Sequence, residues 1–298
     1  MLYEEQIEVI PDVVYCTTDS GLELKLDLYR PKPEWRPTPL PVVIFLHGGG
    51  WETGDKGSKL GVGSSKYLAK NGFCSVSVNY RLSDIAPFPA QIHDAKAAVR
   101  WVRSMAERYG LNPDRIGVWG HSAGGHLAAL LGASSNVPAL EGDGGCAAYS
   151  SQVQAVVTSA APIDLMQMGG WHNHPDSSES RLVGGPLLDN RAVAESANPL
   201  SYITGTLSTP YLILHGTEDE IVPYAQAELL YEAVPQATLI RIKGGDHDYT
   251  GGNLFWDEIY GIVLAFFHRH IVQSPELEEE IQRRREYMAQ QVKRFSRE

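Results

Sequence analysis

The sequence GHSAG at residues 120–124 is the first candidate for chemistry, because it places Ser122 between two glycines. It follows an apolar run at residues 116–119 and precedes residues 125–131, whose composition favours a helix. A serine on a sharp turn between a strand and a helix has an exposed hydroxyl, and the helix N-terminus offers N–H groups to negative charge. This context predicts a nucleophile rather than a serine that only caps a turn.

A second glycine-rich segment, HGGGW at residues 47–51, follows the apolar residues 42–46. Backbone N–H groups in such a run can approach a substrate oxyanion closely, and each donor is worth about 3 kcal/mol of transition-state stabilisation. We expect the N–H groups of Gly49, Gly50 and Ala123 to form an oxyanion hole. The alternative, a phosphate-binding loop, is disfavoured because we expect neither a helix nor GK[ST] to follow.

A histidine and an acid occur later in the chain, each after an expected strand. His247 lies on a glycine-flanked loop after residues 238–242, and three consecutive acids at residues 218–220 follow the apolar residues 211–214. A carboxylate in the earlier loop could reach the histidine, but spacing alone does not choose among Glu218, Asp219 and Glu220. The order serine, acid, histidine is the order found in α/β-hydrolases.

These residue types together predict nucleophilic catalysis, in which His247 takes the proton of Ser122 and a carboxylate fixes the histidine tautomer. No metal or organic cofactor is implied. Four other histidines are weaker candidates because they fall inside or at the end of expected helices: His93, His126, His268 and His270.

The elements that must position these residues alternate between strands and helices, which predicts a mostly parallel sheet with helices on both faces. Short apolar runs, typical of strands buried on both faces, occupy residues 42–46, 73–78, 116–119, 153–157 and 211–214. Helical periodicity covers residues 90–109, 224–234 and 258–270. Period-two patterns at residues 7–15 and 22–29 predict antiparallel strands at the start of the sheet.

Residues 1–274 are expected to form one α/β-hydrolase domain, interrupted at about residues 165–207 by an irregular insertion. Long irregular segments in compact domains are often lids or binding loops. Trp51 and Trp171, with His121 and His172, are candidates for substrate binding, although the aromatic rings could equally serve only to pack the insertion. The charged residues 275–298 are expected to form an exposed helix or tail, with a homodimer contact as an alternative.

The bulk composition excludes several classes of partner. A net charge of −11 and a pI of about 5.4 argue against nucleic acid and anionic membranes. The three cysteines Cys16, Cys74 and Cys146 form neither a metal-binding motif nor a disulfide framework. The first residues do not read as a signal peptide, and no apolar run could span a bilayer, so a cytoplasmic location is expected.

With these motifs in place, the sequence resembles bacterial α/β-hydrolase esterases of the acetyl-esterase and hormone-sensitive-lipase superfamily, over about residues 20–271. It is most similar to the branch carrying HGGGW and GHSAGG, which includes bifunctional acetyl xylan and feruloyl esterases. The resemblance implies that Asp219, in D-x-x-V-P, is the acid. It also implies hydrolysis through an acyl-enzyme, with acetyl or feruloyl esters of a sugar or similar alcohol as substrates.

Two departures from the superfamily pattern favour the carbohydrate-esterase branch. The N-terminus is expected to form strands rather than a helical cap, and His121 stands where many members have aspartate. HGGGW also fits the H-G-G-x-W pattern of kynurenine formamidases, which leaves hydrolysis of a formyl amide as an alternative. A peptidase similar to prolyl oligopeptidases and a non-catalytic binding module are further alternatives that the intact catalytic pattern and the single expected domain disfavour.

Overall fold

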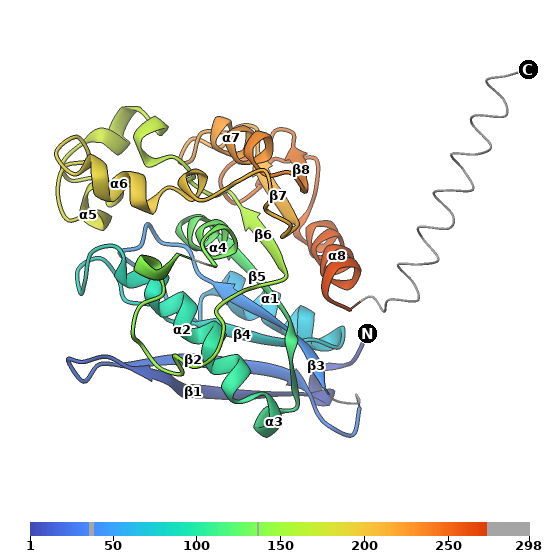
Figure 1. Cartoon of the computed structure of the whole chain (residues 1–298). Helices are drawn as coiled ribbons and strands as arrows, with labels where there is room; N and C mark the ends of the chain where they lie inside the picture. The colour runs from blue at the N-terminus through green and yellow to red at the C-terminus, as the bar shows by residue number, and fades with distance from the viewer. Residues whose placement is uncertain (36–38, 136, 273–298) are drawn as a thin grey trace, which may run out of the picture.

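The computed structural model describes residues 1–35, 39–135 and 137–272, which contain an eight-stranded sheet in the order β1-β2-β4-β3-β5-β6-β7-β8 (Figure 1). The strands are β1 Ile7–Thr17, β2 Glu23–Pro31, β3 Leu40–Leu46, β4 Cys74–Val78, β5 Leu111–His121, β6 Ala155–Ser159, β7 Tyr211–Gly216 and β8 Ala237–Ile242. β2 pairs antiparallel with both β1 and β4, and all other neighbouring pairs are parallel. The predicted fold class is therefore confirmed. The tail predicted at residues 275–298 lies outside the described residues.

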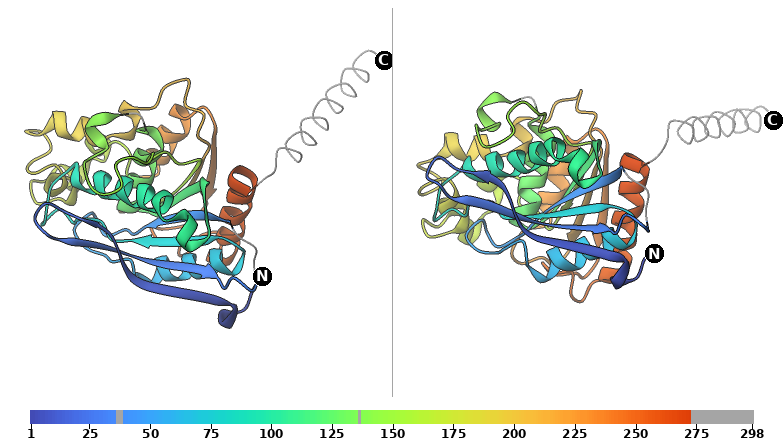
Figure 2. Two further views of the ribbon diagram at one scale, coloured as in Figure 1. Left: turned by 60° about the horizontal axis from the view of Figure 1, so that its bottom comes forward. Right: turned by 90° about the horizontal axis from the view of Figure 1, so that it is seen from below.

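Helices cover both faces of this sheet because its central strands are apolar on both sides. Along β3 and β5, Ile44 and Val118 belong to one hydrophobic cluster, while Phe45 and Trp119 belong to the other. The first cluster includes residues of α2 (Ala90–Ser104), α4 (Ala123–Ala133) and α7 (Ala225–Ala233), and the second includes residues of α1 (Lys59–Lys70) and α8 (Trp256–Phe267). Side chains alternate between faces along a strand, so a continuous apolar run buries both. Figure 2 shows β1 and β2, in dark blue, along one edge.

Helix α1 was not expected, and the prediction that no helix follows the HGGGW loop was wrong. Its sequence contains two glycines and two serines within twelve residues, a composition that gives weak helix propensity. The helix is stabilised instead by an N-cap, in which the Ser58 hydroxyl accepts from the N–H of Gly61, and by burial of Leu68 and Ala69.

The other predicted helices differ from the structure mainly at their ends. The segment 90–109 forms two helices, α2 and the one-turn α3 (Ala106–Tyr109), separated at Met105. Gly110 adopts a φ of +64° and ends α3, as its place in the sequence predicts. Helix α8 begins at Trp256 and continues as a π-helical turn over His268–Val272.

The insertion between β6 and β7 is a packed segment of short helices rather than an irregular loop. It contains α5 (Ser178–Leu182), α6 (Arg191–Ala197) and the 3₁₀ turns Leu165–Gln167, Gly170–Asn173 and Pro199–Ser201, at the upper left of Figure 1. Leu182 and Leu187 are fully buried in the first hydrophobic cluster. The insertion is thus anchored to the core that carries the sheet.

The turn from β5 into α4, which carries the GHSAG motif, is closely packed against neighbouring backbone. A Cβ on Gly120 would overlap the carbonyl of Gly124, and a Cβ on Gly124 would overlap the carbonyl of Leu46 in β3. Ser122, between them, has φ +54° and ψ −123°, a backbone conformation that residues other than glycine rarely adopt. The turn therefore depends on close approach between α4 and the sheet.

We predict that Gly124→Ala lowers the free energy of unfolding by about 3 kcal/mol, because backbone rather than a movable side chain blocks the added methyl group. Gly261→Ala is the matched control, since Gly261 lies within α8 and a Cβ there meets nothing within 4 Å. We expect the control to stabilise the protein by up to about 1 kcal/mol. Urea unfolding of both variants measures the effect, and a Gly124→Ala midpoint equal to wild type would contradict the packing.

Candidate active site

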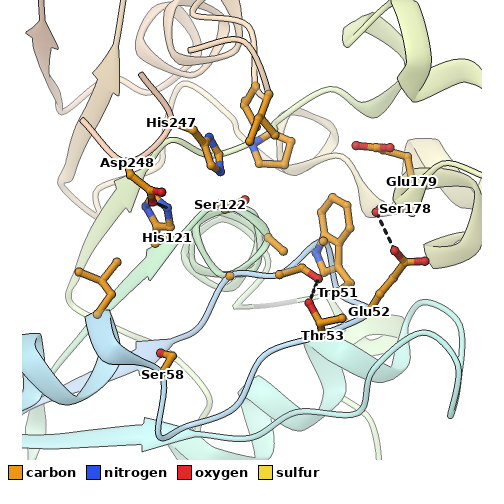
Figure 3. A pocket seen from close by; sticks show the side chains of 18 of the residues that line it. Trp51, Glu52, Thr53, Ser58, His121, Ser122, Ser178, Glu179, His247 and Asp248 are labelled. Atoms are coloured by element: carbon orange, nitrogen blue, oxygen red, sulfur yellow. Dashed lines mark hydrogen bonds and ion pairs between the residues drawn. The ribbon is translucent and has the colours of Figure 1, made fainter. Parts of the chain in front are cut away.

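The predicted site residues all follow the carboxyl ends of parallel strands, where ligands bind in open α/β sheets. The HGGGW loop follows β3, Ser122 follows β5, Asp219 follows β7 and His247 follows β8. Figure 3 shows Ser122 and His247 facing the same cavity. This cavity, the site cavity, has a volume of about 640 Å³ and is lined by both of these residues as well as by the HGGGW loop and the insertion.

Asp219 and His247 are joined by a hydrogen bond of 2.8 Å between Oδ2 and Nδ1. The Asp219 side chain is fully buried, and its Oδ1 accepts the N–H groups of Ile221 and Val222 at 2.9 and 2.8 Å. Burial alone would raise the pKa of Asp219, but hydrogen bonds from the two histidines that it contacts and from Val222 outweigh burial and lower this pKa well below its usual range. An ionised Asp219 can therefore orient the imidazole of His247 near neutral pH.

Of the three consecutive acids, only Asp219 is buried, whereas Glu218 and Glu220 are exposed. The backbone N–H of Glu218 donates a hydrogen bond of 2.9 Å to the carbonyl of Gly245. The structure thus brings together the pair that the family resemblance implied.

His215 is a second partner of the acid that the sequence did not reveal. Its Nε2 lies 3.2 Å from Asp219 Oδ2 and 2.9 Å from the carbonyl oxygen of Val222, and the side chain is buried. Both neighbours are acceptors, so the proton sits on Nε2. A histidine at the end of a buried strand, four residues before an acid, was the available signal.

Ser122 and His247 meet at the site cavity, but no hydrogen bond joins the hydroxyl to the imidazole within the described residues. Contacts between a nucleophile and its base are often long until substrate binds. With the Nδ1 proton of His247 directed at Asp219, Nε2 is the ring nitrogen that can accept a hydrogen bond.

The HGGGW loop presents backbone donors to the same cavity. Gly49 and Gly50 have φ values of +116° and +60°, and within the described residues neither their N–H groups nor that of Ala123 has an acceptor. The carbonyl of Gly49 accepts the N–H groups of Glu52 and Thr53 at 3.0 Å, which fixes the turn. These unpaired donors near Ser122 are what an oxyanion hole requires.

The insertion holds the HGGGW loop from the outside. Glu52, next to Trp51, accepts a hydrogen bond of 2.9 Å from the Ser178 hydroxyl, which Figure 3 shows. Glu52 also forms an ion pair of 2.8 Å with Arg181, and both partners belong to α5. A Cβ on Gly50 would lie 2.7 Å from the Ser178 hydroxyl. The insertion and the HGGGW loop therefore form one wall of the site cavity.

Three aromatic or imidazole side chains predicted to bind substrate line the cavity, with different exposure. Trp51 is buried and packs edge to face on His126 at 5.2 Å, while Trp171 is 61% exposed and stacks on His174 at 4.3 Å. His172 is linked to Glu179 by a hydrogen bond of 2.8 Å, which raises the pKa of His172.

His121 also lines the cavity, where it packs beside the ring of His247. The two ring centroids lie 5.1 Å apart, and His121 Nε2 is 3.5 Å from Asp248 Oδ1. Burial lowers the pKa of His121, although Asp248 opposes this effect. The neutral ring is therefore a wall of the cavity beside the base.

Two further expectations concern groups outside this site. Cys16, Cys74 and Cys146 are free thiols, and no cluster of three or more metal-binding side chains occurs among the residues that the structure describes. Within the same residues, none of the helices has both the length and the apolar character needed to cross a bilayer.

Comparison with known proteins identifies several esterases as similar. Esterase LipQ of Mycobacterium tuberculosis is 34% identical over 220 residues, which cover 73% of this chain and 51% of LipQ. A truncated carbohydrate esterase from gut microbiota has a TM-score of 0.80 and 29% identity, covering 91% of this chain and 99% of that one. Esterase 2 of Thermogutta terrifontis has a TM-score of 0.69 and 29% identity, and the match covers 87% of this chain and 92% of that one.

The chain spans about half the length of curated relatives such as LipQ, whereas it covers nearly the whole of these two solved structures. The relatives and the fold confirm the predicted resemblance to α/β-hydrolase serine esterases. The family described as BD-FAE matches residues 26–234, more than half of the chain, and these residues include the HGGGW loop, Ser122 and Asp219. The chain therefore belongs to the BD-FAE family.

Proposed function

We propose that the protein hydrolyses carboxylic esters through an acyl-enzyme formed on Ser122. The observation that carries the proposal is the convergence at one cavity of three features. These are a serine on a strained turn, a histidine bonded to a buried carboxylate, and backbone N–H groups without acceptors. The esterase names of the relatives support the same reaction class.

The proposed reaction has two steps that use the same groups. Ser122 Oγ attacks the ester carbonyl while His247 Nε2 takes its proton, and the N–H groups of Gly49, Gly50 and Ala123 stabilise the oxyanion. His247 then protonates the departing alcohol, which leaves an ester between the acyl group and Ser122. A water molecule, deprotonated by His247, attacks this ester and releases the acid. Asp219 stabilises the imidazolium in both steps.

We further propose that the substrates are short acyl or feruloyl esters of carbohydrates. The cavity is open and large enough for a small acyl group and part of a sugar, since its volume falls within the usual range for ligand sites. The similarity to a carbohydrate esterase over almost its full length supports this substrate class.

Ser122→Ala should lower kcat for p-nitrophenyl acetate by about 10⁴-fold or more, because it removes the nucleophile. A fluorophosphonate probe should label the wild-type protein and leave this variant unlabelled. Ser20→Ala, at an exposed turn between β1 and β2, is the control and should keep wild-type activity. Undiminished hydrolysis by Ser122→Ala would refute the proposed mechanism.

Asp219→Asn should lower kcat by roughly 10³–10⁴-fold, because an amide in place of the carboxylate no longer fixes the His247 tautomer or stabilises its charge. The flanking variants Glu218→Gln and Glu220→Gln provide matched controls, since both side chains are exposed. We expect each to stay within about threefold of wild type, as surface changes usually have small effects. Steady-state kinetics on all three variants assigns the acid, and equal losses at position 218 or 220 would contradict Asp219.

A substrate panel tests the finer proposal. We expect kcat/KM for acetylated xylo-oligosaccharides or feruloyl sugar esters to exceed that for p-nitrophenyl esters of long acyl chains, because the cavity offers several polar groups for hydroxyls. N-formylkynurenine belongs in the panel because the H-G-G-x-W pattern also fits formamidases. A strong preference for this formyl amide over every ester would replace the ester proposal with amide hydrolysis.

A further inference from the structure

A second cavity adjoins the site cavity on the side of α1 and α8. Its volume is about 570 Å³, and the residues lining it are Lys59, Leu60, Gly63, Asp248, Trp256 and Tyr260. Leu60 and Asp248 line both cavities, so the two spaces meet at these side chains. We call the second cavity the α1–α8 groove.

The α1–α8 groove starts beside the proposed catalytic base. Asp248 follows His247 directly in the chain, and Figure 3 places Asp248 and His121 at one end of the site cavity. Ser178 and Glu179 of the insertion lie at the opposite end, with Ser122 between the two ends. Because His247 must pass its proton to the departing oxygen, the alcohol portion of an ester lies on the histidine side. The groove therefore extends the alcohol side of the site.

Two aromatic rings form one part of the α1–α8 groove. Trp256 and Tyr260 are half-buried, with ring centroids 5.7 Å apart. The Trp256 Nε1–H donates to the carbonyl of Asp248 at 3.2 Å, and Tyr260 stacks on Tyr67 at 5.0 Å. Both rings are thus held in place before any ligand binds, which lowers the entropic cost of using them as a binding surface.

Charged groups of both signs border these rings. Asp248 has a side chain that is 78% exposed, and its hydrogen bond to His121 lowers its pKa, so it is an ionised acceptor near neutral pH. Lys59 is exposed and supplies a donor. A sugar ring has apolar C–H faces and a rim of hydroxyls that both donate and accept hydrogen bonds. A purely apolar acyl chain would offer no hydrogen-bonding partner to Lys59 or Asp248.

We propose that the α1–α8 groove binds the sugar residues on the alcohol side of the ester, with Trp256 and Tyr260 against the ring faces and Lys59 and Asp248 at the hydroxyls. This inference rests on the proposed function for its reaction, but it makes a separate claim about binding. It identifies a carbohydrate subsite beyond the sugar that carries the acyl group.

Binding without turnover tests the subsite directly. In a Ser122→Ala background, a deacetylated xylo-oligosaccharide is titrated by calorimetry. We expect Trp256→Leu to raise Kd by about tenfold, as loss of an aromatic surface does at other binding sites. Trp256→Phe should raise Kd less than Trp256→Leu does, because it keeps an aromatic ring at this position. Tyr231→Leu, an exposed aromatic residue on α7, is the control and should leave Kd unchanged.

Steady-state kinetics in protein that retains Ser122 provides a second test of the subsite. Trp256→Leu should lower the ratio of kcat/KM for an acetylated xylo-oligosaccharide to kcat/KM for p-nitrophenyl acetate by about tenfold, mainly through KM. Lys59→Ala should lower the same ratio about threefold. Because Lys59 is exposed and surface substitutions usually have small effects on stability, this variant keeps the test valid if Trp256→Leu fails to fold.

The outcomes separate the two proposals. Wild-type protein inactive on every ester refutes the proposed function, while oligosaccharide binding to the Ser122→Ala protein still tests the subsite. If the protein is active but neither the kcat/KM ratio nor the Kd for the oligosaccharide changes in Trp256→Leu and Lys59→Ala, the subsite alone is refuted. A selective loss on feruloyl or other aromatic acyl groups, with sugar binding unchanged, would assign the groove to the acyl portion and overturn the proposal.

Discussion

The contact between Gly124 and the carbonyl of Leu46 is the constraint on which the candidate site depends. β3 and β5 are parallel neighbours in which Leu46 is paired with Gly120, so the loops that follow them leave the sheet side by side. Because α4 starts against β3, a Cβ on Gly48 would lie 3.1 Å from the Cβ of Ser122. One close approach therefore places Ser122 and the HGGGW loop side by side.

Asp219 and His247 are placed by a second pair of neighbouring strands. β7 and β8 are in register from Tyr211 and Ala237 to Gly216 and Ile242, and hydrogen bonds continue the pairing into the loops. The N–H of Thr217 donates to the carbonyl of Ile242, and that of Glu218 donates to the carbonyl of Gly245. Asp219 and His247 then meet although they are far apart in the sequence. Their mutual orientation follows from backbone bonds that do not involve the reacting atoms.

The fold class and the position of each candidate reacting residue after a strand could be predicted because they depend on local signals. Apolar runs mark strands buried on both faces, and the glycine pattern around Ser122 reflects backbone contact at Gly120 and Gly124. Helix α1 could not be predicted in the same way. Its weak intrinsic propensity is overcome by tertiary burial, and burial is not visible in a window of sequence.

The same distinction applies to the site. Asp219 could not be selected from three adjacent acids by spacing, since the choice depends on which side chain turns inward to meet His215 and His247. The position of His215 four residues before Asp219 is visible in the sequence, but the contact between the two side chains depends on how the intervening loop folds. The α1–α8 groove was equally hidden, because Lys59 and Trp256 come from elements far apart in the chain. Local pattern thus indicates candidate reacting groups, whereas long-range packing determines which side chains these groups contact.

The anchoring of Glu52 by Ser178 and Arg181 has a consequence for how such a protein changes over time. Residues of α5 line one end of the site cavity, and through Glu52 they also support the loop that carries the proposed oxyanion donors. Under the proposed function, exchange of α5 for a different sequence, whether by natural divergence or by engineering, would therefore alter substrate choice and turnover together. Variants that gain a new substrate here need a compensating contact to Glu52 if they are to keep their rate.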